Sequence, residues 1–177
     1  MEPAHIRFGG GAAETMLSPQ AAVLMLIGIA LILLLPRRKV IAAFLPLCLC
    51  IPLGNVVVLG GVHFTVLRIL IIAGLVRAVI DRGSSREGRF SGGFNRIDWV
   101  VSIWTVTALV TFSLQWMNSQ SLIWSLGVLL DTLGGYLALR FLIPDGETIR
   151  LAVKVLALFC VIQGAEMVSE QIIHQNL

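Results

Sequence analysis

Long apolar runs separated by short basic turns constrain this chain more than any other feature. Six runs have the length of a helix that crosses a bilayer, which takes about 20 residues. Hydrophobic residue types make up 57% of the 177 residues and charged types 13%, whereas soluble domains carry about a quarter charged residues. A soluble domain of this size cannot bury so much apolar surface. The sequence therefore predicts an all-α, polytopic membrane protein and excludes a soluble enzyme, a disordered chain and a disulfide scaffold.

The apolar runs are expected to form one transmembrane helical bundle over residues 1–177. Residues 1–16 form a lead-in without the basic segment of a signal peptide, so the first run is interpreted as an uncleaved span. Residues 81–96 form a polar loop rich in Gly, Ser and Arg. The spans are expected at residues 17–35, 40–59, 62–80, 97–117, 121–143 and 148–168.

The basic residues gather in alternate turns, and this asymmetry predicts the orientation. Lys and Arg concentrate in the cytoplasmic loops of membrane proteins. With the turns after the first, third and fifth spans in the cytoplasm, Arg7 lies on the outer side, Arg68 lies within a span, and every other basic residue lies at the inner side. The loop at 81–96 is then cytoplasmic. Both termini are expected in the periplasm, with the chain in the inner membrane of a bacterium.

The second span contains helix-breaking residues. Pro46 and Pro52 interrupt it, and Gly54 and Asn55 follow. Proline removes a backbone donor and kinks a helix, and broken backbone at membrane depth lies against protein or a water-filled cavity. The simpler interpretation is a proline kink; the alternative is that residues 52–55 line a cavity near the outer face.

Arg68 and Asp131 interrupt two apolar spans that are expected to run in the same direction. Each charge alone near a helix centre costs about 2.5–3.5 kcal/mol on insertion scales. Arg77 follows Arg68 by nine residues, and Arg140 follows Asp131 by nine. If Arg77 and Arg140 extend to the cytoplasmic interface, Arg68 and Asp131 lie at one depth, roughly 13.5 Å above it. We therefore predict a buried ion pair between Arg68 and Asp131.

Two interpretations of this pair are open. In the first, which we favour because buried pairs are often structural, the pair fixes the register of the two helices. In the second, Arg68 binds an anion such as a lipid diphosphate in the outer leaflet, because the planar guanidinium makes bidentate contacts with such groups.

A polar stripe lies near the outer end of the sixth span. Its residues are spaced by three, four and four, so they share one helix face: Gln163, Glu166, Glu170 and His174. The stripe either coordinates a metal, lines an aqueous vestibule or is the solvated end of a helix, and we favour the last because two carboxylates and one histidine are a poor ligand set. No motif for a metal, a cofactor or nucleic acid is found. The expected partner is the lipid bilayer.

Five short segments between residues 36 and 170 carry a resemblance to a known family. They are residues 51–54 (IPLG), 60–70 (GGVHFTVLRIL), 94–98 (FNRID), 131–136 (DxxGxY) and 139–143 (LRFLI). Together they resemble the amino-terminal half of bacterial O-antigen ligase/polymerase-like integral membrane proteins. The resemblance implies a role in building cell-envelope polysaccharide, in which a glycan is transferred from undecaprenyl diphosphate on the periplasmic face.

The resemblance also limits what this chain is expected to do alone. Catalytic residues of that family usually lie in or around a large periplasmic loop of the carboxyl-terminal half, and these 177 residues hold no such loop. The chain is therefore expected to be incomplete or inactive alone and to need a carboxyl-terminal half or an envelope-assembly partner. No catalytic residue is assigned, and Arg68 is the candidate for contact with the carrier diphosphate.

Two alternatives from other classes are a small transporter or channel subunit and a non-catalytic membrane scaffold of an envelope complex. The proline-interrupted span fits a transporter weakly. Against transport, the sequence indicates no third buried charge that continues a pathway beyond Arg68 and Asp131.

Overall fold

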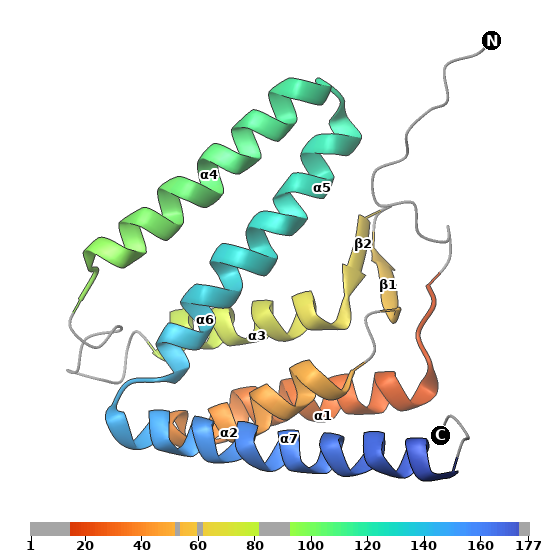
Figure 1. Ribbon diagram of the computed structural model, residues 1–177. Coiled ribbons are helices and arrows are strands. Elements are labelled where there is room, and N and C mark those ends of the chain that lie inside the picture. The colour runs from red at the N-terminus through yellow and green to blue at the C-terminus, as the bar shows by residue number, and fades with distance from the viewer. Residues whose placement is uncertain (1–14, 52–53, 60–61, 82–92, 174–177) are drawn as a thin grey trace.

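The computed structural model describes residues 15–51, 54–59, 62–81 and 93–173. Helices dominate, and one short β-hairpin separates the second helix from the third (Figure 1). The elements in order are α1 (Pro19–Leu34), α2 (Arg37–Cys50), β1 (Val56–Leu59), β2 (Val62–Thr65), α3 (Val66–Ile80), α4 (Arg96–Trp116), α5 (Ser119–Leu129), η2 (Leu130–Gly134), α6 (Gly135–Leu142) and α7 (Gly146–Ile173).

Successive helices run back and forth, so the basic turns meet at one end of the molecule. The ends of α1, α3 and α6 and the starts of α2, α4 and α7 lie on the left of Figure 1, and the β-hairpin lies on the right. We call the left side the basic end, because it holds Arg37, Arg77 and Arg140, and the right side the hairpin end. α1 packs on α2 and α3, and α7 packs on α2.

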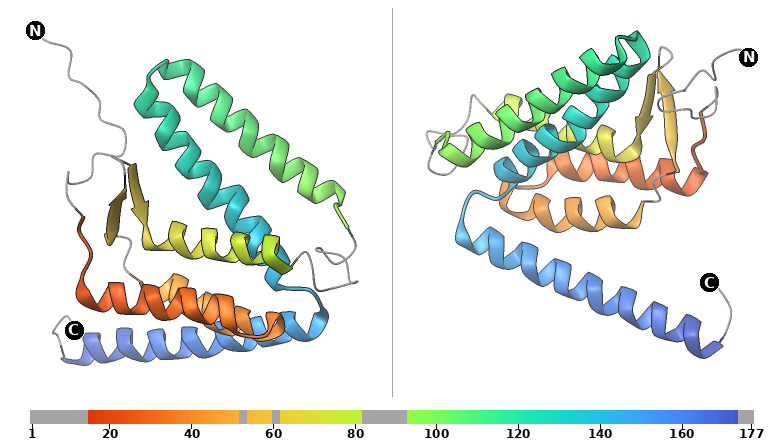
Figure 2. Two further views of the ribbon diagram at one scale, coloured as in Figure 1. Left: turned by 180° about the vertical axis from the view of Figure 1, so that it is seen from behind. Right: turned by 45° about the horizontal axis from the view of Figure 1, so that its top comes forward.

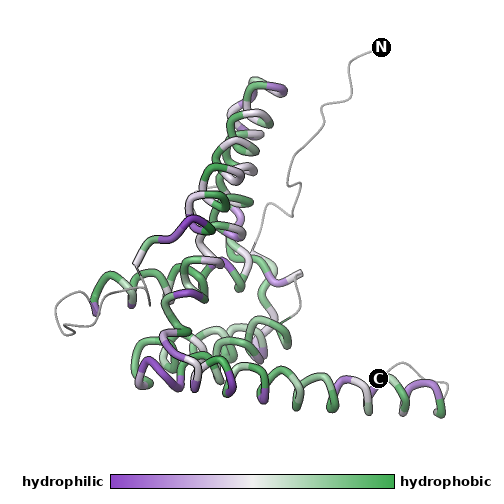
Figure 3. The backbone as a smooth tube through the Cα atoms, turned by 60° about the vertical axis from the view of Figure 1, so that its left-hand side comes forward, coloured by the Kyte–Doolittle hydropathy of each residue, from purple (hydrophilic) through white to green (hydrophobic). Residues whose placement is uncertain are grey.

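Three helices are long and apolar enough to cross a membrane. They are α4 with 21 residues, the continuous helix Ser119–Leu142 with 24, and Gly146–Ile172 of α7 with 27. The first three helices are shorter, with 16 residues in α1, 14 in α2 and 15 in α3. Coloured by hydropathy, the helices are predominantly hydrophobic (Figure 3). The structure therefore has a helix at each position where a span is expected, and within the described ranges three of these helices have full bilayer length.

The β-hairpin corrects the predicted limits of the second and third spans. The spans predicted at residues 40–59 and 62–80 are too long, because α2 ends at Cys50 and α3 begins at Val66. In the hairpin Val56 pairs with Thr65 and Val58 with His63. Three consecutive valines favour extended backbone, and the prolines and glycines on either side disfavour helix. The fold is therefore mostly α rather than all-α.

The hairpin is joined to the segment before α1. Met16 forms a bridge with Val56, and the amide of Ser18 donates to Oδ1 of Asn55 at 3.0 Å. Of the residues expected to kink α2 or line a cavity, Pro46 lies within α2, Pro52 lies outside the described residues, and Asn55 fastens the hairpin to the start of α1.

The core lies where α1, α2, α3 and α6 meet. A Cβ on Gly28 of α1 would lie 2.9 Å from Cδ2 of Leu70 and 3.0 Å from Cδ1 of Leu47, so any larger residue would displace these leucine side chains and the glycine allows the helices to approach closely. On α3, a Cβ on Gly74 would lie 3.5 Å from Cβ of Ala138, which is ordinary van der Waals contact. The fully buried side chains of the core include Ile32, Val40, Ile41, Leu70, Phe141 and Leu142.

α4 and α5 form an antiparallel arm that projects away from α1, α2 and α7 (Figures 1 and 2). The two helices join at Met117, whose φ of 39° places it in the left-handed region, and Asn118 caps the start of α5. Between them the hydroxyls of Ser113 and Ser125 lie 3.1 Å apart. α4 and α5 pack on each other and on η2, and we call this pair of helices the arm.

Candidate functional site

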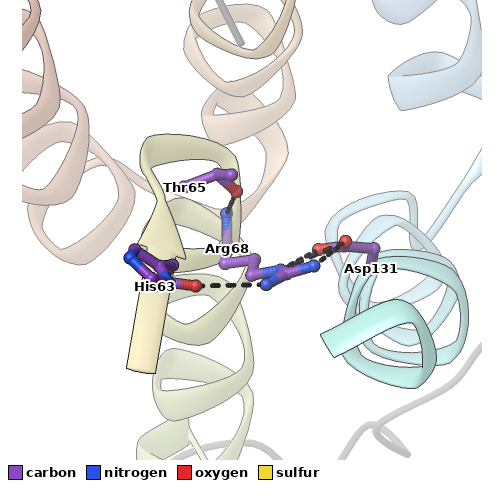
Figure 4. Close-up of polar contacts among 4 residues, drawn as sticks. All are labelled: His63, Thr65, Arg68 and Asp131. Carbon is purple, nitrogen blue, oxygen red and sulfur yellow. Dashed lines mark hydrogen bonds and ion pairs between the residues drawn. The ribbon is translucent and has the colours of Figure 1, made fainter. Parts of the chain in front are cut away.

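Arg68 and Asp131, which the sequence predicts to pair, form an ion pair between α3 and η2 (Figure 4). Nη2 of Arg68 lies 2.8 Å from Oδ2 of Asp131, and Nε lies 3.0 Å from Oδ1. Nη1 donates to the backbone oxygen of His63 at 3.2 Å. The guanidinium is therefore held on two sides, by a carboxylate and by strand β2.

The local sequence places each partner of the pair. Thr65 is the N-cap of α3 and accepts a hydrogen bond from the amide of Arg68, so Arg68 lies in the first turn, next to the hairpin. Asp131 lies in η2, a π-helical turn within the long helix. Such turns insert an extra residue into a helix and frequently occur at functional sites.

Gly127 makes room for the guanidinium. A Cβ at this position would lie 2.7 Å from Cζ and Nη2 of Arg68, closer than real Cβ contacts allow. Gly134 is similarly restricted, since its Cβ would lie 2.9 Å from Cδ1 of Leu130 and 3.3 Å from Cγ2 of Ile71. The sequence indicates tight packing around these glycines, and the structure shows that Gly127 faces the charged group itself.

The pair is only partly buried. The side chain of Arg68 is 18% exposed and that of Asp131 is 35% exposed. An arginine has five N–H donors. Three of those on Arg68 are used by Asp131 and His63, so one N–H on each terminal nitrogen has no acceptor among the described residues. The site therefore presents a fixed guanidinium with remaining donors.

A second polar cluster lies at the basic end, and sequence reasoning missed it. Asp98 of α4 is fully buried. Its Oδ1 accepts a 2.6 Å hydrogen bond from the hydroxyl of Tyr136 and contacts Nη1 of Arg140, and its Oδ2 accepts from the amide of Asn95 at 2.6 Å. The signals for it are present in the sequence: Asn95 and Asp98 have the spacing of a capping box, and Tyr136 and Arg140 lie one helical turn apart.

The arginines at the basic end are held by nearby oxygens. Arg77 and Arg140 both lie at the basic end, and both are held by protein oxygens: Arg77 is 8% exposed and donates to the backbone oxygen of Ile32, while Arg140 pairs with Asp98. Asp98 is a third buried charge, which the sequence does not indicate. Arginines at the basic end therefore bond to buried oxygens, including the last carbonyls of α1, whose C-terminal dipole favours a cation.

The polar stripe on α7 converges on no partner that the structure describes. Gln163 and Glu166 are exposed and Glu170 is partly buried, whereas His174 lies outside the described residues. Among the described residues, no three His, Cys, Asp or Glu side chains are arranged to hold a metal ion.

In comparisons with known proteins, no protein-family model, curated protein or solved structure matches this chain.

Proposed function

We propose that this chain is a multi-pass protein of a bacterial inner membrane that binds the diphosphate of an undecaprenyl diphosphate-linked glycan through Arg68. In this proposal it corresponds to the amino-terminal part of an O-antigen ligase/polymerase. It binds the carrier and leaves glycan transfer to a carboxyl-terminal half or a partner of the envelope machinery.

The observation that carries the proposal is the fixed, partly exposed guanidinium of Arg68. Asp131 and the oxygen of His63 hold it in one orientation, and two of its N–H groups have no acceptor in the part of the chain that the structure describes. Because Asp131 neutralises the charge of Arg68, Arg68 contributes to binding through oriented hydrogen bonds rather than through net charge. Two such hydrogen bonds favour a ligand with two phosphates, a diphosphate, over a ligand that makes one weak contact.

The proposed topology gives the depth of Arg68 in the bilayer. We place the hairpin end at the periplasmic side and the basic end at the cytoplasmic side, because Lys and Arg concentrate in cytoplasmic loops. Arg68 directly follows the hairpin at the start of α3. It then lies in the outer half of the bilayer, where a carrier lipid that serves the periplasmic face keeps its diphosphate.

The test is binding of undecaprenyl diphosphate to the purified chain in nanodiscs, with undecaprenyl monophosphate as the comparison. The variant is Arg68→Gln with Asp131→Asn, which leaves no unpaired charge. We expect it to bind the diphosphate at least tenfold more weakly. Arg38→Gln, which removes an exposed arginine paired with Asp145, is the matched control and is expected to bind normally. Equal affinity of the double variant and the parent would refute the proposal.

A second candidate, a transporter or channel subunit, is favoured by the buried Asp98 cluster. Asp131 lies on the helix Ser119–Leu142, and Asp98 lies on the neighbouring helix α4. Buried carboxylates in membrane helices often mark ion pathways. Proteoliposomes with a trapped pH dye test this candidate. If the chain transports, the proteoliposomes should show a proton or ion flux above that of empty liposomes. Tyr136→Phe is expected to lower this flux.

A further inference from the structure

We propose that the arm is a lever that pivots at the junction of η2 and α6 and that the Arg68–Asp131 pair is the latch that holds it against α3. The proposal concerns the conformation of the protein and does not depend on which ligand it binds.

The pivot lies where Gly134 and Gly135 join η2 to α6. Backbone hydrogen bonds in a π-helical turn deviate from the regular helical ladder, and such turns are places where helices bend. Just beyond this junction, α4 is tied to α6 by the bonds from Asp98 to Tyr136 and Arg140. The arm is therefore fixed at the basic end, next to its proposed hinge.

The latch lies on the other side of the hinge. Arg68 of α3 bonds to Asp131 and lies against the backbone at Gly127, the last turn of α5 before η2. Farther along, α5 packs on α4, and among the described residues α3 packs on η2 and α6 rather than along α5. In the ribbon views, the arm diverges from α3 towards the turn between α4 and α5 (Figures 1 and 2).

These contacts give the arm a polar attachment that can be broken without changing the core. In a bilayer, neighbouring helices gain no hydrophobic free energy from association, so packing and polar contacts decide their attachment. Loss of the ion pair leaves α5 held by α4 and by η2, which still packs on α3. The arm then samples a wider range of angles to α3, which opens a lateral gap between α5 and the hairpin.

The experiment measures spin-label distances in the full chain in nanodiscs. Cys50 and Cys160 are native exposed cysteines. The arm reporter carries labels on Cys50 and on Gln120→Cys at the start of α5, with Cys48→Ala and Cys160→Ala. The body reporter carries labels on Cys50 and Cys160, with Cys48→Ala alone. We expect Asp131→Asn to broaden the distance distribution of the arm reporter at least twofold and to leave that of the body reporter unchanged.

A second variant covers the case in which Asp131→Asn fails to fold. Gly127→Ala keeps both charges but places a methyl group where the guanidinium lies, and it is expected to broaden the arm distances as well. Arg38→Gln, which breaks the ion pair with Asp145 and removes no contact between the arm and α3, is the matched control and is expected to leave both reporters unchanged. The latch is refuted if the folded variants keep the parent distribution, or if the body reporter broadens as much as the arm reporter.

Discussion

The two carboxylates Asp98 and Asp131 are satisfied in different ways. Asp131 receives all its described hydrogen bonds from Arg68 and stays 35% exposed. Asp98 is fully buried and bonds to a backbone amide, a phenol and a guanidinium. Because burial without partners is costly for a charge, Asp98 depends on several neighbours at once, and Asp131 on one.

Removal of one partner of the Arg68–Asp131 pair is expected to cost more than removal of both. Asp131→Leu leaves Arg68 unpaired, at a cost of about 2 kcal/mol, less than for a fully buried pair because water or headgroups reach the site. The double variant Arg68→Leu with Asp131→Leu removes that penalty and should be more stable than Asp131→Leu. Equilibrium unfolding in detergent micelles measures both. A double variant as unstable as the sum of the two single variants would contradict the coupling.

The loss of stability caused by substitutions around Asp98 should be larger when a charged partner is removed than when a neutral one is removed. Tyr136→Phe removes one hydrogen bond and is expected to destabilise the chain by about 1 kcal/mol. Arg140→Gln leaves the buried carboxylate without its cation and should cost about 3 kcal/mol or more. For comparison, Arg38→Gln breaks an ion pair whose arginine side chain is 69% exposed and should cost less than about 1 kcal/mol. The same unfolding measurement gives the ranking, and equal effects of Arg140→Gln and Arg38→Gln would contradict it.

At the scale of the element, helix ends account for much of the fold. Thr65, Asn95, Asn118 and Asp145 each accept a hydrogen bond from a backbone amide in the first turn of the helix that follows. These caps decide where helices start, since the first amides of a helix have no partner within it. α2 lacks a side-chain cap and begins after Pro36 with three basic residues.

The cap of α7 predicts a pH dependence. The side chain and the amide of Thr148 donate to Asp145, and these bonds, assisted by Arg38, lower the pKa of the Asp145 carboxyl. A lowered pKa in the folded state stabilises the fold above the unfolded pKa, and this contribution is lost as the pH falls through the folded pKa. The melting temperature of the parent should therefore exceed that of Asp145→Ala at pH 7, and the difference should shrink below about pH 4. A difference that is constant down to pH 2 would show that the carboxylate charge does not matter.

At the scale of the whole molecule, the basic end and the hairpin end give the chain a polarity. The arginines that mark the basic end are largely engaged: Arg37 donates to the backbone oxygen of Phe141 at 2.8 Å and lies over its ring, and Arg77 and Arg140 bond to α1 and α4. The arginines from which the orientation is predicted therefore also join helices.

The proposed topology predicts opposite accessibility at the two ends. In a chain without native cysteines, Gln120→Cys at the tip of the arm should react with a membrane-impermeant maleimide in intact cells. Arg150→Cys at the start of α7 should react only after permeabilisation. Labelling of Arg150→Cys in intact cells would reverse or break the topology, and the proposed depth of Arg68 would then have no basis.

Sequence periodicity and charge by themselves determined that the chain is helical and apolar, that its basic turns share one end, and that Arg68 and Asp131 pair. These follow from local composition, from the fixed rise of a helix and from the cost of an unpaired charge in an apolar layer. The tertiary structure alone decided the β-hairpin, the burial of Asp98 with Tyr136 and Arg140, and the fit of Gly127 against the guanidinium. Those features depend on which helices meet and on side-chain direction, and the π-helical turn at η2 shifts that direction in a way that residue spacing does not reveal.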